Sequence, residues 1–404
     1  MSTRHLRRTG IPGDMRKADD LLRRTSDIGL IAGAVGLATA RGGPSYAGAF
    51  GTRSSVTTAS MSQDTIFEVT GLLRPLLAVA VLQLVDAGLL GLDDPVRAVL
   101  PELAAAQVLD RFDRSGAPVR RPATRHITLR HLLTHTAGLN VGSGWNGAPR
   151  EDGWAKPYRP SATLLADPGH RWLHCADTDL IAKVIERLSG LSLAEYLRDG
   201  ICRELGMPDT GFGVAHQFRD RVAGGWRDSD EGVPQFHSTP RDYVKFVEAM
   251  LWRDESLLSR EAFELLRDNQ IGALTVPKVV DLASVRTPGD INIYPEMRLY
   301  PDTEAQWSLG FMLNTQDVPD GPRAGTQTSA GNSHTFCWID PRSEMAGLVF
   351  IQPALEQPVP SEPLLRDFQR SLYAEREARL RRRRIPPHLR DSWAIEPLSL
   401  WWLL

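Results

Sequence analysis

One long apolar segment organises the chain. It runs from residue 67 to residue 95 and reads FEVTGLLRPLLAVAVLQLVDAGLLGLDDP. From Leu72 onward its apolar residues fall on nearly every side of a helix, which is typical of a helix buried all round. The residues before Leu72 predict a short strand and a tight turn, and Gly88 with the following Asp-Asp-Pro predicts where the helix ends. We therefore expect a buried central helix.

Other segments show the periods of strands and helices. Residues 28–52 predict a hairpin with a Gly-Gly-Pro turn, and 178–188 predict a helix whose apolar residues recur with the helical period. Ser238 or Thr239 is the expected cap of a further helix with Pro240 in its first turn. The remaining expected elements are a strand at 307–313, a closing strand pair within 327–352 and a basic helix at 368–384.

Composition and charge narrow the class of protein. The 404 residues are 42% hydrophobic and 24% charged, as in soluble globular proteins, and the formal net charge of −2 argues against nucleic acid as a partner. No apolar run has the length of about 20 residues that a membrane helix needs, and no convincing signal peptide is present, so we expect a cytoplasmic protein without a membrane partner. The three cysteines fit reduced thiols, and no metal or other cofactor is expected.

Two further segments carry conspicuous residues. His131 and His135 are expected four apart on a helix that ends at Gly138, where packing and capping explain them better than chemistry. Residues 140–167 are irregular and contain Trp145, Trp154 and Tyr158, so they predict either a lid or pocket wall that binds substrate, or a surface loop held by its aromatic residues.

Several motifs together resemble those of the serine β-lactamases, the penicillin-binding proteins and their esterase relatives. The family's Ser-x-x-Lys motif falls on the turn before the central helix, with Gly71 in place of serine and Arg74 in place of lysine. Residues 128–139 resemble a signature of the esterase-like branch. The second motif, Tyr-x-Asn or Tyr-x-Ser, falls on 174–176 (His-Cys-Ala), and the third, Lys/His-x-Gly or Trp-Gly-Gly, falls on 329–331 (Ser-Ala-Gly).

The resemblance covers residues 28–375 and implies an α+β fold of the β-lactamase/transpeptidase type. It implies an antiparallel sheet flanked by helices, an inserted mostly helical region, and an active site at their junction. The expected organisation is an N-terminal arm (1–27), a main domain (28–375) with its sheet at 28–70 and 300–375 and its helical insertion at 95–250, and a basic helix end with a docking tail (376–404). The tail ends in Trp-Trp-Leu-Leu, which we expect to dock either on its own domain or on a second subunit, so a homodimer joined by this tail is possible.

The altered motifs bear directly on chemistry. The family's mechanism needs an activated nucleophile beside a base, but glycine carries no nucleophile and arginine is always protonated. Backbone N–H groups do not depend on side-chain identity, so Gly71 and Asn332 are expected to retain an oxyanion hole, and Arg74 to add a fixed positive charge. His174 and His237 are the candidate acid and base, since histidine titrates near neutral pH.

Three functions remain open. The first is a repurposed enzyme of bacterial secondary metabolism that catalyses proton-transfer chemistry (cyclisation, elimination, isomerisation or rearrangement) on a small carbonyl or carboxylate compound without an acyl-enzyme, and that is not a serine β-lactamase or Ser-x-x-Lys esterase. The second is a non-catalytic ligand-binding protein. The third is a hydrolase or acyltransferase with a displaced nucleophile such as Cys175 or Ser329. The substitution of tyrosine by His174 favours the first.

Overall fold

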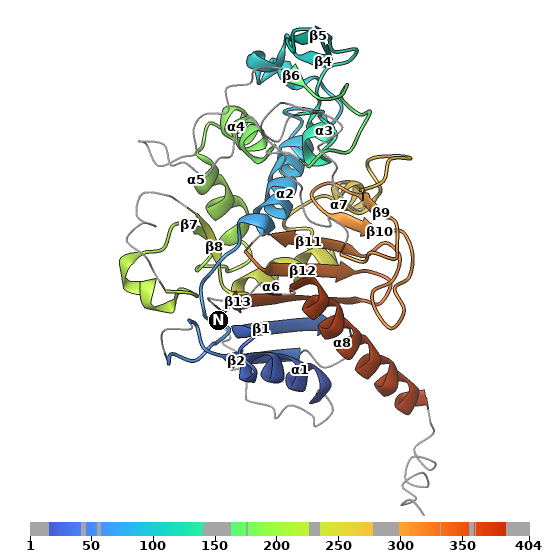
Figure 1. The fold of residues 1–404 in the computed structure, drawn as a ribbon. Helices are drawn as coiled ribbons and strands as arrows, with labels where there is room; N and C mark the ends of the chain where they lie inside the picture. Colours follow the sequence, from blue (N-terminus) through green and yellow to red (C-terminus); the bar gives the residue numbers. More distant parts are fainter. Residues whose placement is uncertain are drawn as a thin grey trace, which may run out of the picture.

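A central antiparallel sheet of seven strands dominates the described part of the chain (Figure 1). The computed structural model describes residues 16–41, 46–54, 58–139, 163–174, 177–225, 235–277, 299–331, 333–354, 359 and 361–384. From edge to edge the strands are β2 (Tyr46–Gly51), β1 (Ile31–Ala40), β13 (Met345–Pro353), β12 (Thr335–Asp340), β11 (Gln327–Gly331), β10 (Met312–Asn314) and β9 (Ala305–Trp307).

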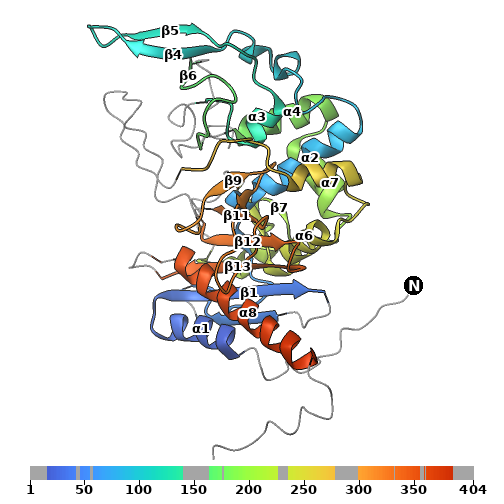
Figure 2. The ribbon, with the colours of Figure 1, turned by 90° about the vertical axis from the view of Figure 1, so that its right-hand side faces the viewer.

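Helices cover both faces of this sheet. The first helix, α1 (Arg16–Asp27), and the last, α8 (Ser361–Arg384), lie together on one face, and α6 (Pro240–Trp252) lies on the other (Figures 1 and 2). The Thr239 hydroxyl accepts the backbone N–H of Asp242 and caps α6, with Pro240 at its first position, as the sequence predicted.

The remaining elements form a second, mostly helical part, which lies above the sheet and along its left side in Figure 1. Its α-helices are α2 (Leu73–Asp86), α3 (Leu129–Leu133), α4 (Thr178–Ser189), α5 (Leu193–Leu197) and α7 (Arg260–Arg267). Shorter helical turns are η1 (Thr70–Leu72), η2 (Val96–Ala98), η3 (Pro101–Leu103), η5 (Arg198–Cys202) and η6 (His216–Arg221). Two small sheets join β3 (Phe67–Glu68), β8 (Phe236–Ser238) and β7 (Gly211–Phe212), and β5 (Pro118–Pro122), β4 (Gln107–Phe112) and β6 (Thr163–Leu164).

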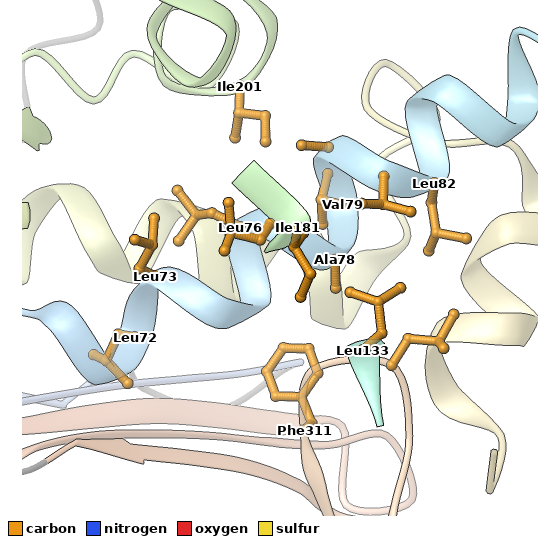
Figure 3. Close-up of a cluster of buried hydrophobic side chains, with 14 of the residues drawn as sticks. Leu72, Leu73, Leu76, Ala78, Val79, Leu82, Leu133, Ile181, Ile201 and Phe311 are labelled. Carbon is orange, nitrogen blue, oxygen red and sulfur yellow. The ribbon is translucent and has the colours of Figure 1, made fainter. Parts of the chain in front are cut away.

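The helix α2 forms the centre of the larger hydrophobic core. Its side chains meet Leu133, Ile181, Ile201 and Phe311, which come from four separate segments (Figure 3). The helix ends where Gly88 takes a left-handed conformation (φ 73°), which glycine adopts without steric cost. Burial on all sides, predicted from the sequence, is confirmed and fixes the direction in which the N-terminal end of α2 points.

The α+β architecture is confirmed, and so are the N-terminal hairpin and the helix at 178–188. The single strand expected at 307–313 is wrong, because the chain turns between β9 and β10. Gly310 makes that turn with φ 82°, and any side chain there would meet the carbonyl oxygen of Arg74 at 3.2 Å. Close packing on α2 therefore interrupts the strand.

Further findings add detail to the sequence-based picture. The region at 95–250 contains the hairpin β4–β5 as well as helices, and α8 begins earlier than the expected basic helix and runs across residue 375. The described residues include no helix that combines the length and apolar character needed to cross a bilayer. Cys202 and Cys337 are free, buried thiols.

Candidate active site

The site begins at the N-terminal end of α2, where η1 is held by three neighbouring elements. The backbone N–H of Val69 donates to β8, and the hydroxyl of Tyr243 on α6 donates to the carbonyl of Leu72 at 2.7 Å. From the sheet, the hydroxyl of Ser329 on β11 donates to the carbonyl of Gly71 at 3.3 Å. Sheet and helical part therefore meet at residue 71, at the junction that the sequence predicted.

Gly71 and Gly331 lie in direct backbone contact at this junction. A Cβ atom added to Gly71 would stand 2.1 Å from the Cα of Gly331, and one added to Gly331 would stand 2.7 Å from the Cα of Gly71. Neither residue can carry a side chain without a shift of β11 or η1. The strand thus fills the space that a residue-71 side chain would need, and an acyl carbonyl could lie between these two glycines only if they separated.

Arg74 is the second residue of α2, and its guanidinium has a partner on each side. Its Nη1 donates to the carbonyl of Leu132 at 3.3 Å, and its Nη2 stands 3.9 Å from Oδ2 of Asp177. The Arg74 side chain is 11% exposed and that of Asp177 is fully buried. The positive charge expected at the site is present, but it is paired with a carboxylate.

A second residue reaches the same carboxylate from the segment after α3. His135 Nδ1 is 3.4 Å from Asp177 Oδ2, and the His135 side chain is 2% exposed. The expectation that His135 lies on a helix ending at Gly138 is wrong. The helix α3 stops at Leu133, and His135 takes a left-handed conformation (φ 57°) that non-glycine residues rarely adopt.

Backbone hydrogen bonds join the His135 segment to the segment that carries His174. The N–H of Leu173 donates to the carbonyl of His135 at 2.8 Å, and the N–H of Gly169 donates to the carbonyl of Thr136 at 2.7 Å. As a result, the rings of His135 and His174 lie with their centroids 4.9 Å apart. We call Arg74, His135, His174 and Asp177 the Arg74 cluster.

Two tryptophans enclose this cluster. The rings of Trp172 and Trp307 have their centroids 5.3 Å and 5.0 Å from that of His135, both in edge-on geometry, and 5.3 Å from each other. Such offset and edge-on arrangements suit the quadrupoles of aromatic rings. They exclude water from the imidazole of His135 and so strengthen the electrostatic interactions inside the cluster.

The cluster keeps its histidines uncharged. Burial, followed by the charge of Arg74, holds the pKa of His135 well below its ordinary value. Burial lowers the pKa of His174 to about 3, with further lowering from His135 and Arg74, while the carboxylate of Asp177 acts in the opposite direction. At neutral pH each ring therefore carries one N–H and one nitrogen lone pair, so each can accept a proton.

The other residues singled out from the sequence fall in different places. His237 lies on β8 opposite Glu68 of β3, and its Nδ1 is 2.9 Å from the carbonyl oxygen of Gln235. His131 is structural as expected, because its Nδ1 and the hydroxyl of Thr128 form a reciprocal cap at the start of α3. The predicted residues Trp145, Trp154, Tyr158, Cys175 and Asn332 and the tail from 385 onward lie outside the described residues.

Sequence reasoning did not assign four residues to the site. Packing and capping were the preferred explanation for His135, Trp172 and Trp307 were not singled out, and a favourable charge at the start of α4 was preferred for Asp177 over a role in orienting His174. The side chain of Asp177 makes no capping hydrogen bond to α4. An acid at a helix start is ordinarily a cap, so the sequence alone offered no signal for its burial against Arg74.

Comparison with known proteins gives consistent matches over most of the chain. The β-lactamase family profile matches residues 18–367. ML-236A carboxylate methylbutanoyltransferase from Penicillium citrinum is 27% identical over 354 residues, which cover 79% of this chain and 83% of that protein. Lovastatin esterase from Penicillium rubens is 26% identical over 379 residues, with 83% and 92% covered. A solved structure of simvastatin synthase (LovD) from Aspergillus terreus, the LovD6 mutant, superposes with a TM-score of 0.72 at 26% identity, covering 92% and 99% of the two chains.

Two expectations about function are wrong in the light of these relatives. Proton-transfer chemistry without an acyl-enzyme was favoured because the motifs are altered, and a serine β-lactamase or Ser-x-x-Lys esterase was excluded for the same reason, while a hydrolase or acyltransferase was kept only as the third alternative. The relatives that match about four fifths of the chain include an acyltransferase and an esterase, and these relatives support hydrolase or acyltransferase chemistry instead. The physical reason for the error is that one missing side chain at Gly71 reports on a single group, whereas the class of reaction depends on the whole site.

Proposed function

Since this chain belongs to the β-lactamase family, we propose that it is a hydrolase or acyltransferase acting on a small-molecule ester or thioester in secondary metabolism. Three observations support the proposal: the family profile spans residues 18–367, which include the altered motifs; an acyltransferase and an esterase match most of the chain; and Arg74 and His174, which the motif resemblance assigns to the lysine and tyrosine positions, lie in one cluster. The site thus offers a proton acceptor beside a fixed charge.

His174 is the proposed group that moves the proton. It is half-buried, in contrast to the fully enclosed His135, and its pKa of about 3 keeps it neutral throughout the physiological range. A neutral imidazole can accept a proton from an attacking hydroxyl and return it to a leaving group. A positioned acid or base accelerates a reaction by about 10²- to 10⁴-fold, and most when its pKa lies near the working pH, so the proposal requires the pKa of His174 to rise toward that range when substrate is bound.

Ser329 is the proposed replacement for the nucleophile that residue 71 lacks. Its hydroxyl lies on β11 against the carbonyl of Gly71, and the residue is 8% exposed. A serine hydroxyl attacks a carbonyl when a base removes its proton. The mechanism requires His174 to come within hydrogen-bond reach of Ser329 when substrate is bound.

The proposed reaction has two halves. The Oγ of Ser329 bonds to the acyl carbon while its proton passes to His174, and the bond to the alcohol or thiol then breaks as the leaving group takes that proton. In the second half, water or an acceptor alcohol attacks the acylated Ser329 and gives its proton to His174. Return of this proton to Oγ regenerates the enzyme, as hydrolysis or as transfer.

A panel of p-nitrophenyl esters and N-acetylcysteamine thioesters of increasing chain length tests the proposal. We expect turnover by the wild type, an acyl adduct on the peptide that contains Ser329, and rates at least 10²-fold lower for Ser329→Ala and His174→Ala. Thr70→Val is the matched control, because the Thr70 hydroxyl is adjacent to Gly71 but donates to Glu68 at 2.9 Å. Absence of turnover across the panel would remove the proposed function. Turnover that survives Ser329→Ala without an adduct would remove Ser329 from it.

The contact between Gly71 and Gly331 favours a second candidate, a protein that binds acyl compounds without turning them over. The strand occupies the space of the missing side chain, and the charge of Arg74 is neutralised by Asp177. In that case a panel compound would raise the melting temperature and be recovered unchanged. The substrate-binding roles of Asn332, Trp145, Trp154 and Tyr158, a role for His237, cytoplasmic location and a homodimer remain predictions.

A further inference from the structure

A tyrosine hydroxyl on α6 holds the turn that carries Gly71. The hydroxyl of Tyr243 is 2.7 Å from the carbonyl oxygen of Leu72, the residue next to Gly71 in η1. A carbonyl oxygen can only accept, so the tyrosine must be the donor. Tyr243 is fully buried, and this burial raises the pKa of its hydroxyl well above the ordinary value. The donor proton is therefore present throughout the physiological pH range.

The helix α2 does not require this hydrogen bond. Leu72 is the N-cap of α2, and the carbonyl of an N-cap residue accepts the first hydrogen bond of its helix. The oxygen has a second lone pair, which is open to the tyrosine hydroxyl. The ring of Tyr243 is packed independently, with centroids 5.5 Å from Phe246 of α6 and 6.1 Å from Phe350 of β13. The hydroxyl thus ties η1 to the packing of α6 on the sheet.

Two adjacent carbonyls of η1 accept from hydroxyls of different elements. Ser329 on β11 donates to the carbonyl of Gly71 at 3.3 Å, and Tyr243 donates to that of Leu72 at 2.7 Å. The first of these bonds cannot last through the proposed reaction, because Ser329 then gives its proton to His174 and bonds to the acyl carbon. When Ser329 releases Gly71, the bond from Tyr243 still holds the neighbouring carbonyl in place.

We propose that Tyr243 is a positioning residue, which keeps η1 in place against β11 while Ser329 leaves the carbonyl of Gly71. The catalytic consequence rests on the proposed function, whereas the anchoring of η1 does not depend on turnover. Gly71 and Gly331 are in backbone contact, so a small movement of η1 changes the space where an acyl carbonyl would lie beside Ser329. A misplacement of about 1 Å can lower a rate by about 10²-fold.

Hydrogen exchange of single backbone amides tests the anchoring without a substrate. The N–H of Leu72 donates to the carbonyl of Val69 at 2.8 Å. The N–H of Leu73 donates to the carbonyl of Thr70, so these two amides report whether η1 opens. Tyr243→Phe keeps the ring and removes only the hydroxyl. We expect both amides to exchange about three- to tenfold faster in this variant, as for the loss of one hydrogen bond, and the amides in the middle of α2 to keep wild-type rates.

Tyr196→Phe is the matched control for this experiment. The hydroxyl of Tyr196 donates to the carbonyl of Ala80 at 3.5 Å, which is the same kind of bond to the middle of the same helix. The control should leave exchange at Leu72 and Leu73 unchanged. Unchanged exchange of these two amides in Tyr243→Phe, or an equal increase along the whole of α2, would overturn the anchoring.

Kinetics on the ester panel test the consequence. We expect kcat of Tyr243→Phe to fall about tenfold or more with KM nearly unchanged, because the acyl group still binds while Ser329 is less well placed to attack it. Tyr196→Phe should match the wild type. Faster exchange in η1 with an unchanged kcat would overturn the positioning role. Faster exchange in a protein whose wild type turns over no panel compound would remove the proposed function and leave the anchoring by Tyr243 standing.

Discussion

Residues 71 and 74 lie one turn apart on the same helix start, yet their surroundings differ in kind. At Gly71 the side chain is absent and the backbone of Gly331 occupies its place. At Arg74 a cation is present, and it is met by the buried carboxylate of Asp177. Backbone packing therefore fills the space at position 71, whereas an ion pair neutralises the charge at position 74.

The difference shows which parts of the site still depend on chemistry. A glycine pair in contact is stabilised by close packing alone and needs no particular polar group. A buried arginine and a buried aspartate depend on each other, because either one alone would be a charge without compensation. We therefore expect substitution of Arg74 to lower the free energy of unfolding more than substitution of Gly71 does.

The largest effect is expected from Arg74→Met. Removing one partner of a buried ion pair leaves the other uncompensated, so the free energy of unfolding should fall by about 3 to 5 kcal/mol. Urea unfolding measures this without adding salt. Arg97→Met, at an exposed site on η2, should stay within about 0.5 kcal/mol of the wild type.

The double variant Arg74→Met/Asp177→Asn separates mutual dependence from simple loss of packing. If the two groups compensate each other, the double variant should be more stable than Arg74→Met alone, which is a coupling that two independent sites do not show. Equal destabilisation by the single and the double variant would mean that the pair contributes only its volume, and the contrast with Gly71 would disappear.

A smaller effect is expected at the closed position. Gly71→Ser would bring a Cβ to 2.1 Å from the Cα of Gly331, so β11 or η1 must shift, and such overpacking costs about 1 to 3 kcal/mol. Gly211→Ser is the matched control, since nothing lies within 4 Å of a Cβ at that strand position. Urea unfolding of both variants measures the difference. Equal stability would show that the contact between the glycines yields easily and that a side chain at 71 can be accommodated.

These contrasts also show why the sequence predicted one part of the molecule better than the other. The buried helix α2 and the amphipathic helix α4 were predicted because their periodicity and end signals are local. The positions of Arg74 and His174 followed from the resemblance of their motifs. These features are set by residues close together in the chain or by a matched pattern.

The contacts that define the site have no such local signal. Asp177 meets Arg74 and His135 because three segments, separated by roughly 40 residues or more, fold against one another. The contact between Gly71 and Gly331 could not be predicted from the hydrophobic pattern, because glycine has no side chain that could contribute to a strand or helix period. His135 was misassigned since its left-handed backbone interrupts what reads as a continuing helix.

The smallest expected effect uses His131 to separate capping from the Arg74 cluster. Burial, aided by the charge of Arg125, lowers the pKa of His131 to about 4, and its Nδ1 accepts the N–H of Thr128 at 3.2 Å. In the unfolded chain a histidine titrates near 6.5. Between these values the unfolded state binds more protons, so stability falls as pH is lowered from about 6.5 to about 4.

His135 and His174 contribute in the same direction, because their pKa values are also lowered by burial. His131→Gln removes only the part of the pH-dependent loss of stability that comes from His131. Glutamine three residues after a threonine cap can still reach back to the backbone N–H, so the variant keeps α3 and loses the titration. We expect its melting temperature to fall less between pH 7 and pH 5 than that of the wild type. His170→Gln, at an exposed position, should follow the wild type. If His131→Gln showed the full acid sensitivity, the whole loss would belong to the Arg74 cluster, whose neutral imidazoles would then be the feature of this site most sensitive to pH.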